Sequence, residues 1–245
     1  MGSNVATFVQ ARSNSVTQQR IKQILSYVME CHSIFLVDGI TYSKSGIASM
    51  GTVMFEDHLK FEFVENYLVK NKSLLKGKIS DLEEINFACE TQQRYMDAVD
   101  GKIKPDKIDI YINKLGLKNL FAKEEDENIY FAIECKRIQI LSDSKDYVLD
   151  IQNKFVNRTH VNARLPFEGQ IAFIENGKLD HIIVSDQINS LLKTTLSIET
   201  DLFLTPNKLH TKVGGTYMSS HKRNPGKHPF SVYHLMFDYR KVVLN

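Results

Sequence analysis

Cysteine is scarce in this chain of 245 residues: there are three, far apart, and none forms a C-x-x-C pair. This pattern argues against a disulfide framework and a zinc site, and it favours a reducing compartment. No apolar run approaches the roughly 20 residues that span a bilayer. Residues 1–12 lack the basic and apolar regions of a secretory signal. We therefore expect a cytoplasmic protein without a membrane partner.

Other absences narrow the class of function. The chain contains neither the phosphate loop G-x-x-x-x-G-K-[ST] nor the G-x-S-x-G elbow, which argues against a nucleotide motor and a serine hydrolase. It has no internal repeat, low-complexity tract or obvious linker, and its hydrophobic content of 42% is enough for a core. The net charge of +2 by itself favours no partner. One domain is expected from this length.

Apolar periodicity predicts helices first and strands later. The expected helices cover residues 15–30, 55–69, 83–97 (after the capping-box pattern of residues 80–83), 146–158 and 185–196 (capped by Ser185). The expected strands cover residues 34–37, 107–112, 128–140, 169–174, 216–220 and 231–238. This order predicts an α/β fold with a mixed central sheet flanked by helices.

Two carboxylates stand in strand sequence that is otherwise apolar. Glu134 and Lys136 follow the apolar residues 130–133 and share one face of the strand, because side chains alternate with period two. Asp109 stands in the middle of an isoleucine-rich strand, where aspartate is rare. If the two strands pair through the polar loop of residues 118–127, the two acids converge. A divalent cation with oxygen ligands, Mg²⁺ or Mn²⁺, then removes their repulsion.

The lysine has a chemical role beside such a cation, because its ammonium can orient the attacking water and stabilise charge developing on a phosphate. Two other acid-x-Lys triplets, at residues 100–102 and 143–145, stand in turn-like sequence and are interpreted as solvated surface. An alternative without chemistry remains open. In it, Glu134 and Lys136 form a strand-edge ion pair and Asp109 caps a turn.

Through the sequences PDKIDI at residues 105–110 and FAIECK at residues 131–136, the chain resembles the PD-(D/E)xK nuclease superfamily. The resemblance covers residues 55–175. It implies a restriction-endonuclease-like core with a mixed sheet, a hairpin that bears the acids, and metal-dependent hydrolysis of phosphodiester bonds. Asp106 directly follows a proline and matches the literal motif, but Asp109 has the better strand context and is preferred.

In this resemblance Asp109, Glu134 and Lys136 are catalytic, and Asp109, Glu134 and the backbone carbonyl of Cys135 bind Mg²⁺ or Mn²⁺. The single domain then divides into an N-terminal helical extension (residues 1–54), a catalytic core (55–175) and a C-terminal sheet with a basic segment (176–245).

Many members of the superfamily add a glutamate from a helix ahead of the hairpin. At about 100° per residue, the apolar side chains of residues 55–69 cover one broad helix face, and Glu56 falls near its middle. An acid on the face that points to the core is unusual, so Glu56 is the best candidate for a third catalytic and metal-binding acid. Glu90 is the runner-up. A helical i, i+4 pair with Lys60 is the alternative explanation for Glu56.

Residues 202–237 contain no acid, although they contain five lysines or arginines and four histidines. A segment of one sign in a nearly neutral protein is the footprint expected for a phosphate backbone, with an ordinary solvated surface as the alternative. The expected nucleic-acid contacts are Lys212, His221, Lys222 and Arg223, together with Gln152 or Lys154 on the helix that follows the Glu134 strand.

These expectations combine into a Mg²⁺-dependent endodeoxyribonuclease. The role of stand-alone members of the superfamily places it in bacterial restriction or anti-phage defence. DNA is the expected partner, with a homodimer or a partner protein of a defence system left open. One alternative is a nucleic-acid-binding or assembly protein that retains the fold without hydrolysis, and the intact Asp-Glu-Lys set argues against it. A nuclease acting on RNA, or in repair or transposition, is the other.

Overall fold

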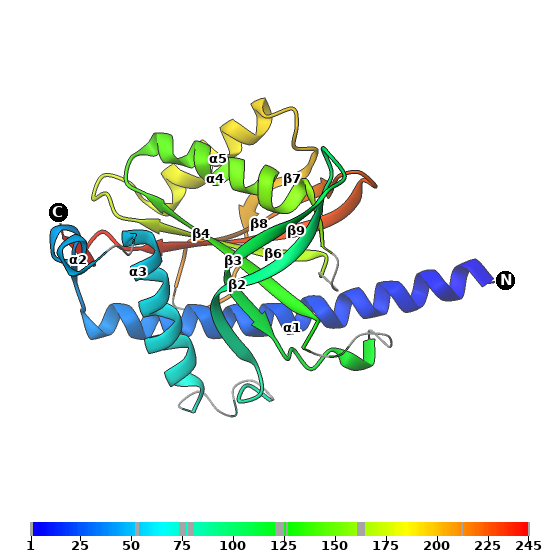
Figure 1. Cartoon of the computed structure of the whole chain (residues 1–245), viewed down its shortest axis with the longest axis horizontal. Coiled ribbons are helices and arrows are strands. Elements are labelled where there is room, and N and C mark those ends of the chain that lie inside the picture. Colours follow the sequence, from blue (N-terminus) through cyan, green and yellow to red (C-terminus); the bar gives the residue numbers. More distant parts are fainter. Residues whose placement is uncertain are drawn as a thin grey trace.

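The computed structural model describes residues 2–51, 54–73, 77, 81–120, 125, 127–160, 165–211 and 213–244, without the side chains of residues 2–12, 50, 159 and 160. Within these ranges, an eight-stranded mixed sheet has the order β5-β2-β3-β4-β6-β9-β8-β7 (Figure 1). The strands are β2 (Asn86–Asp97), β3 (Ile103–Asn113), β4 (Tyr130–Ile138), β5 (Arg158–His160), β6 (Phe167–Ile174), β7 (Thr200–Pro206), β8 (Thr216–Arg223) and β9 (His228–Asp238).

The pairing of neighbouring strands changes twice across the sheet, from antiparallel to parallel and back to antiparallel. β2, β3 and β4 form an antiparallel meander, β4, β6 and β9 run parallel to one another, and β8 and β7 continue antiparallel from β9. A separate parallel pair joins β1 (Tyr42–Ser43) to β10 (Val243–Leu244). The expectation of an α/β fold with a mixed sheet flanked by helices is confirmed.

The helices are α1 (Gly2–Asp38), α2 (Lys44–Met50), α3 (Phe55–Glu62) with its continuations η1 (Phe63–Val69) and η2 (Lys70–Lys72), η3 (Lys118–Leu120), η4 (Leu141–Asp143), α4 (Ser144–Asp150) with its continuation η5 (Ile151–Val156), and α5 (His181–Thr194). In the described part of the chain, no helix combines the length and the apolar character that crossing a membrane requires.

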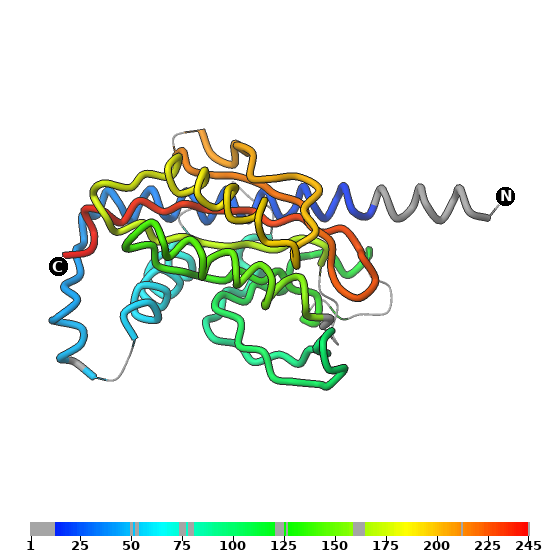
Figure 2. Tube along the Cα trace, turned by 90° about the horizontal axis from the view of Figure 1, so that it is seen from above, coloured from blue at the N-terminus to red at the C-terminus, as the bar shows by residue number. Residues whose placement is uncertain are grey.

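Two hydrophobic cores lie on opposite faces of the sheet, since successive side chains of a strand point to opposite sides. Phe173 and Phe237 pack in the core with α1 and α3, whereas Ala172 and Met236 pack in the core with α4 and α5. Figure 1 shows α4 and α5 above the sheet and α1 below it. Seen from above, α3 and the β2–β3 hairpin stand out from the body on the same side (Figure 2).

Gly169 allows the close approach of β4 and β6. It pairs with Ile133, and a Cβ atom at this position would lie 2.7 Å from Ile133 Cγ1 and 3.1 Å from Phe131 Cζ. A larger residue would push the two strands apart. The absence of a side chain at Gly169 therefore lets β6 lie close to β4 at Ile133, one residue before Glu134.

Several expected elements are confirmed. The helices expected over residues 15–30, 55–69 and 146–158 correspond to α1, to α3 with η1, and to α4 with η5, which ends at Val156. The strands expected over residues 107–112, 128–140, 169–174, 216–220 and 231–238 correspond to β3, β4, β6, β8 and β9, and β4 is two residues shorter at each end than expected. β3 and β4 pair as antiparallel neighbours, as expected.

Two expectations near the amino terminus are wrong. Residues 34–37 continue α1 instead of forming a strand, because Phe35 packs from the helix against Tyr67 and Tyr239, with ring centroids 5.0 and 5.1 Å apart. The helix expected up to residue 97 is strand β2, which pairs with β3 along most of its length. Ser80, which opens the capping pattern, lies outside the described residues.

The start of α5 also differs from the expectation. Its cap is Asp180, whose side chain accepts hydrogen bonds from the N–H groups of Ile182 and Ile183, and Ser185 lies inside the helix. Asp180 caps the helix as a serine would, because one of its carboxylate oxygens accepts hydrogen bonds from two N–H groups of the first helical turn.

Candidate active site

β3 and β4 separate at the residues that the sequence singles out. The last pair between the strands joins Ile110 to Ile133, so Asp109 and Glu134 stand at the next position along the ladder. The hairpin thus brings Asp109 next to residues 134–136, as expected. Because the strands part here, the backbone of β4 beyond this point needs hydrogen-bond partners other than β3.

Two of the expected acids supply these partners. The N–H of Cys135 donates to Asp109 Oδ2 at 2.8 Å, and the N–H of Arg137 donates to Glu56 Oε2 at 3.0 Å. Glu56 therefore points from α3 toward the sheet, beside the triplet of residues 134–136. Carboxylates from β3 and α3 thus replace the backbone acceptors that a paired strand would offer to β4.

Lys60 of α3 lies at the centre of a group of acids. Its side chain is 1% exposed, and Nζ lies 2.8 Å from Asp57 Oδ1, 3.0 Å from Glu90 Oε1 and 3.0 Å from Asp109 Oδ1. Lys60 thus contacts these acids instead of Glu56. Burial lowers the pKa of Lys60, but the carboxylates of Asp109 and Asp57 outweigh burial and raise it. We call these four residues the Lys60 cluster.

Glu90 reaches this cluster through an unusual backbone. Its φ of 55° lies in the left-handed region, which is uncommon for residues other than glycine. Glu90 stands opposite Asp109, between the pairs that join β2 to β3 on either side, and its carboxylate also lies 2.7 Å from Lys107 Nζ. The runner-up for the third acid is therefore part of the same centre.

Lys136 faces helix α4. Its Nζ lies 3.2 Å from Asp150 Oδ2. Burial lowers the pKa of Lys136, but Asp150 and Glu56 outweigh burial, so the pKa is raised and the side chain is a cation at neutral pH. Burial raises the pKa of Asp150, with Lys136 and Lys154 acting in the opposite direction. Burial likewise raises the pKa of Glu56, partly offset by Lys136.

Glu134 lies in a second group of charges. Its side chain is 3% exposed, and Oε2 lies 3.4 Å from Lys154 Nζ, which also lies 3.4 Å from Asp106 Oδ1. Asp106 is 1% exposed and forms a further ion pair with Arg158, whose guanidinium lies over the ring of Tyr95. We call Lys154, Glu134 and Asp106 the Lys154 cluster.

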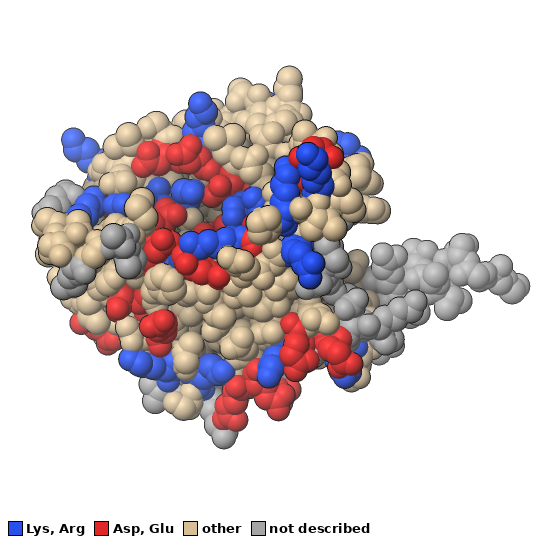
Figure 3. Space-filling view, in the orientation of Figure 1, with Lys and Arg blue, Asp and Glu red and all other residues tan. Residues whose placement is uncertain are grey.

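The two aspartates that the sequence left in competition thus have different neighbours. Asp106, the literal match to the motif, belongs to the Lys154 cluster, and Asp109 belongs to the Lys60 cluster. Residues 134–136 lie between the clusters. Figure 3 shows acidic and basic side chains gathered side by side across the middle of this face, in the region of α3, α4 and the β2–β3 hairpin.

The donors around β4 fit a hard cation by their chemistry. Asp109, Glu134 and the carbonyl of Cys135 offer oxygen atoms, and Mg²⁺ is commonly held through one or two carboxylates with water and substrate phosphates completing its shell. Among the described residues, no group of three His, Cys, Asp or Glu side chains is arranged to hold a metal ion.

The expected nucleic-acid contacts on β8 lie away from this centre, because β6 and β9 separate β8 from β4. His221 is fully buried, and Lys222 pairs with Glu199 and lies 3.4 Å from Asp201. Arg223 pairs with the buried Glu168 and lies over the ring of Phe230. Lys212 lies outside the described residues, and Gln152 is partly exposed in η5, two residues before Lys154.

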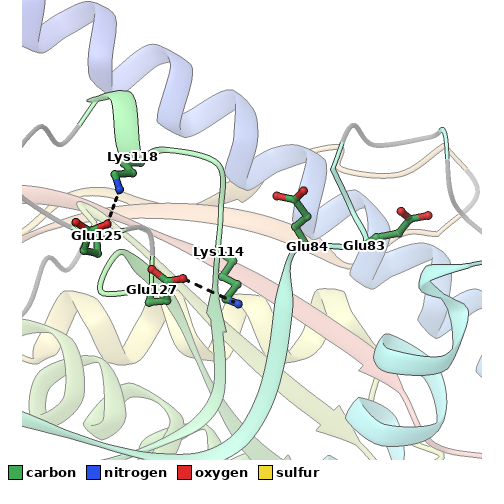
Figure 4. A pocket seen from close by; sticks show the side chains of 6 residues that line it. All are labelled: Glu83, Glu84, Lys114, Lys118, Glu125 and Glu127. Carbon is green, nitrogen blue, oxygen red and sulfur yellow. Dashed lines mark hydrogen bonds and ion pairs between the residues drawn. The ribbon is translucent and has the colours of Figure 1, made fainter.

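A separate hollow lies at the other end of β3. It is lined by Glu83, Glu84, Lys114, Lys118, Glu125 and Glu127. Figure 4 shows Lys118 paired with Glu125 and Lys114 facing Glu127 at 4.0 Å, with the two remaining glutamates across from them. The hollow lies next to the residues that follow β3, whereas Asp109 precedes Ile110, the first residue of β3 that pairs with β4, so the two places are distinct.

Sequence reasoning finds Asp109, Glu134, Lys136 and Glu56 but misses Asp150, which sits in an ordinary helical sequence. Lys60 enters the sequence argument only as an alternative partner of Glu56. Comparison of the chain with protein-family models, with curated protein sequences and with solved structures finds no match.

Proposed function

We propose that this chain is a metal-dependent endodeoxyribonuclease that hydrolyses phosphodiester bonds at Asp109, Glu134 and Lys136. The observation that carries the proposal is the convergence of Asp109 with residues 134–136 where β3 and β4 part, fixed by the hydrogen bond from the N–H of Cys135 to Asp109 Oδ2. Charges placed at the end of a buried strand pair are costly unless they are paired or serve chemistry.

The elements around these residues support the resemblance to the PD-(D/E)xK superfamily. A helix ahead of the hairpin supplies Glu56, the hairpin bears the acids, and the helix after β4 supplies Asp150 to the lysine. A role in restriction or anti-phage defence, and a homodimer or partner protein, follow from the same resemblance and belong to this proposal.

The chemistry assigned to the residues is hydrolysis. The oxygen of a water attacks phosphorus, the bond from phosphorus to one sugar oxygen breaks, and that oxygen takes up a proton and leaves as an alcohol. Lys136, oriented by Asp150, stabilises the charge that develops on the phosphoryl oxygens. Glu56, whose pKa is raised by burial, is suited to accept the proton of the water. A Mg²⁺ or Mn²⁺ ion at Asp109, Glu134 and the Cys135 carbonyl would supply Lewis-acid polarisation of the phosphate.

A second candidate function has its own observation. Lys60, Lys136 and Lys154 contact acids of the centre, so these acids have cationic partners within the chain, which favours a protein that keeps the fold without cutting. The intact set of Asp109, Glu134 and Lys136 argues for hydrolysis instead.

Supercoiled plasmid DNA separates the two candidates. We expect the purified protein to nick or cut it with Mg²⁺ or Mn²⁺, and EDTA to stop the reaction. Lys136→Ala and Glu134→Gln should lower the rate by about 100-fold or more while DNA binding is retained, because each removes a charge that acts on the phosphate or the metal. Glutamine keeps the volume of Glu134 beside Lys154.

Exposed residues of the same types provide matched controls. Lys178→Ala and Glu84→Ala should cut like the wild type. Full activity in both Lys136→Ala and Glu134→Gln would reject the assignment of the centre. A wild-type protein that binds DNA but cuts neither DNA nor RNA with any divalent cation would favour the binding function.

A further inference from the structure

Among the described cations near the candidate centre, the ammonium of Lys60 is the most completely enclosed. It is 1% exposed, and its three contacts, at 2.8, 3.0 and 3.0 Å, come from acids on α3, β2 and β3. An ammonium has three N–H donors, so these contacts use its full capacity. Burying such a group without partners would be strongly unfavourable, and this geometry offsets that penalty.

The contacts of Lys60 also determine how Asp109 is held. Oδ1 of Asp109 accepts from Lys60, and Oδ2 accepts from the N–H of Cys135. Each oxygen therefore has a fixed partner, one from α3 and one from β4.

The charges around Lys60 are nearly matched. Three carboxylates, those of Asp57, Glu90 and Asp109, face the two ammonium groups of Lys60 and Lys107, which leaves a net charge of −1. A neutral side chain at position 60 would leave a net charge of −2 around the buried position of the ammonium. Oxygen ligands from three carboxylates with that net charge suit one divalent cation.

We infer that Lys60 is a built-in cation of the centre: its ammonium fills the position beside Asp109 that a second divalent ion would otherwise take. The wild-type chain then binds a single divalent cation, at Asp109, Glu134 and the Cys135 carbonyl. Lys60 is in this sense a positioning residue, which fixes Asp109 before the ion arrives. The single-ion statement rests on the proposed function, whereas the assignment of Lys60 as a cation surrogate does not.

Ion counting tests the inference without any measurement of cleavage. Electron paramagnetic resonance of free Mn²⁺ in a titration gives the number of ions bound per chain. We expect one for the wild type, one for Lys60→Arg, which keeps the charge, and two for Lys60→Met. The double variant Lys60→Met with Asp57→Asn should return to one, because it removes one carboxylate of the vacated position.

Thermal unfolding provides the second readout. Lys60→Met should unfold several degrees below the wild type in EDTA and should regain much of that loss when Mn²⁺ or Ca²⁺ is added, since ligand binding to the folded state raises its stability. Lys70→Met, an exposed lysine in the continuation of the same helix, should show neither effect. A lysine with a purely structural role would lower the unfolding temperature without cation-dependent recovery.

The outcomes are separable. Two Mn²⁺ ions in the wild type, or an unchanged count together with no cation-dependent recovery in Lys60→Met, would overturn the inference. If Lys60→Met does not fold even with Mn²⁺, no cation can replace the ammonium, and the inference is likewise overturned. A wild type that binds no ion, with one ion in Lys60→Met, would reject the proposed metal centre and support Lys60 as the cation surrogate.

Discussion

The two halves of the sheet bury polar side chains in opposite ways, apart from the buried Glu168 of β6, which pairs with Arg223 of β8. Around β3 and β4 the buried groups are charged, as in the Lys60 and Lys154 clusters. On β8 and β9 they are neutral: Ser219 Oγ lies 2.7 Å from His221 Nε2 and 2.8 Å from His234 Nε2. The chain of hydrogen bonds continues to the hydroxyl of Tyr147, 3.0 Å from His234 Nδ1, and to that of Thr200, 3.0 Å from His221 Nδ1.

The difference distinguishes buried polar groups that stabilise the fold from buried charged groups that are suited to a reaction. Burial lowers the pKa of His221 to about 4 and that of His234 well below its usual value, so both rings are neutral at physiological pH. Neutral groups with matched hydrogen bonds add specificity to a core at little cost. Buried charges carry a desolvation penalty that a hydrophobic side chain would avoid. The charged half is therefore where a function is expected, and the neutral half is its support.

The largest expected effect comes from matched deletions in the two halves. Asp109→Asn should lower plasmid cleavage by about 100-fold or more, because it removes a charge from the centre. Ser219→Ala leaves both histidine Nε2 atoms without their partner and should lower the free energy of unfolding by about 1–3 kcal/mol. Its cleavage rate per folded molecule should be unchanged. Nicking assays and urea unfolding of both variants measure the two effects.

Two results would contradict this division of the sheet into a charged half with a function and a neutral half that supports it. If Ser219→Ala cuts as slowly as Asp109→Asn while folded, the neutral half takes part in the reaction. If Asp109→Asn loses stability and keeps its cleavage rate, the carboxylate serves to join β3 to β4 through Cys135.

The next effect is a sensitivity to acid that should come from His32, a buried histidine of α1 that packs against β9 of the neutral half. Burial lowers the pKa of His32, which stacks on Phe237 at 3.9 Å, from 6.5 to about 3. With a lowered pKa, the folded state binds fewer protons than the unfolded chain between these values. The contribution of neutral His32 to the free energy of unfolding is therefore fully present above pH 6.5 and is lost as the pH falls below that value. Between pH 7.5 and pH 5 this histidine should remove about 2 kcal/mol from the free energy of unfolding.

His32→Phe isolates this effect, because phenylalanine keeps the stacking and cannot be protonated at these pH values. The variant should be at least as stable as the wild type at pH 7.5 and should lose less stability by pH 5, as measured by guanidinium unfolding at both values. His228→Phe, at an exposed position of β9, is the control. Equal losses in the wild type and His32→Phe would contradict the assignment.

Local sequence was enough to single out four residues that the fold brings together at the candidate centre, because each breaks a local pattern. Asp109 and Glu134 stand in apolar strands, Lys136 shares a face with Glu134, and Glu56 lies on the apolar face of a helix. Asp150 breaks no pattern: an acid in a helix is ordinary until the fold places it beside Lys136. Such a contact is decided by how α4 packs, which no short window of sequence contains.

Lys60 illustrates the same limit. Its sequence neighbours suggested a helical pair with Glu56, whereas its ammonium contacts Glu90 and Asp109, 30 and 49 residues away. The prediction of the fold failed for a comparable reason at β2, where local capping signals favoured a helix. Residues 86–97 are a strand because they pair with β3, and strand formation depends on such partners more than on intrinsic preference.

The smallest expected effect concerns the acid-free segment. Its sequence suggested a free basic surface, but Lys222 pairs with Glu199 and Asp201, which lie just before the segment and reach it across β7 and β8. Lys222→Ala should therefore weaken DNA binding only a few-fold and lower the slope of log affinity against log salt by at most about one, the contribution of a single phosphate contact. Lys178→Ala is the exposed control. An unchanged slope would remove Lys222 from the interface, whereas a drop of several units would make the neutral half the main DNA surface and end its role as support alone.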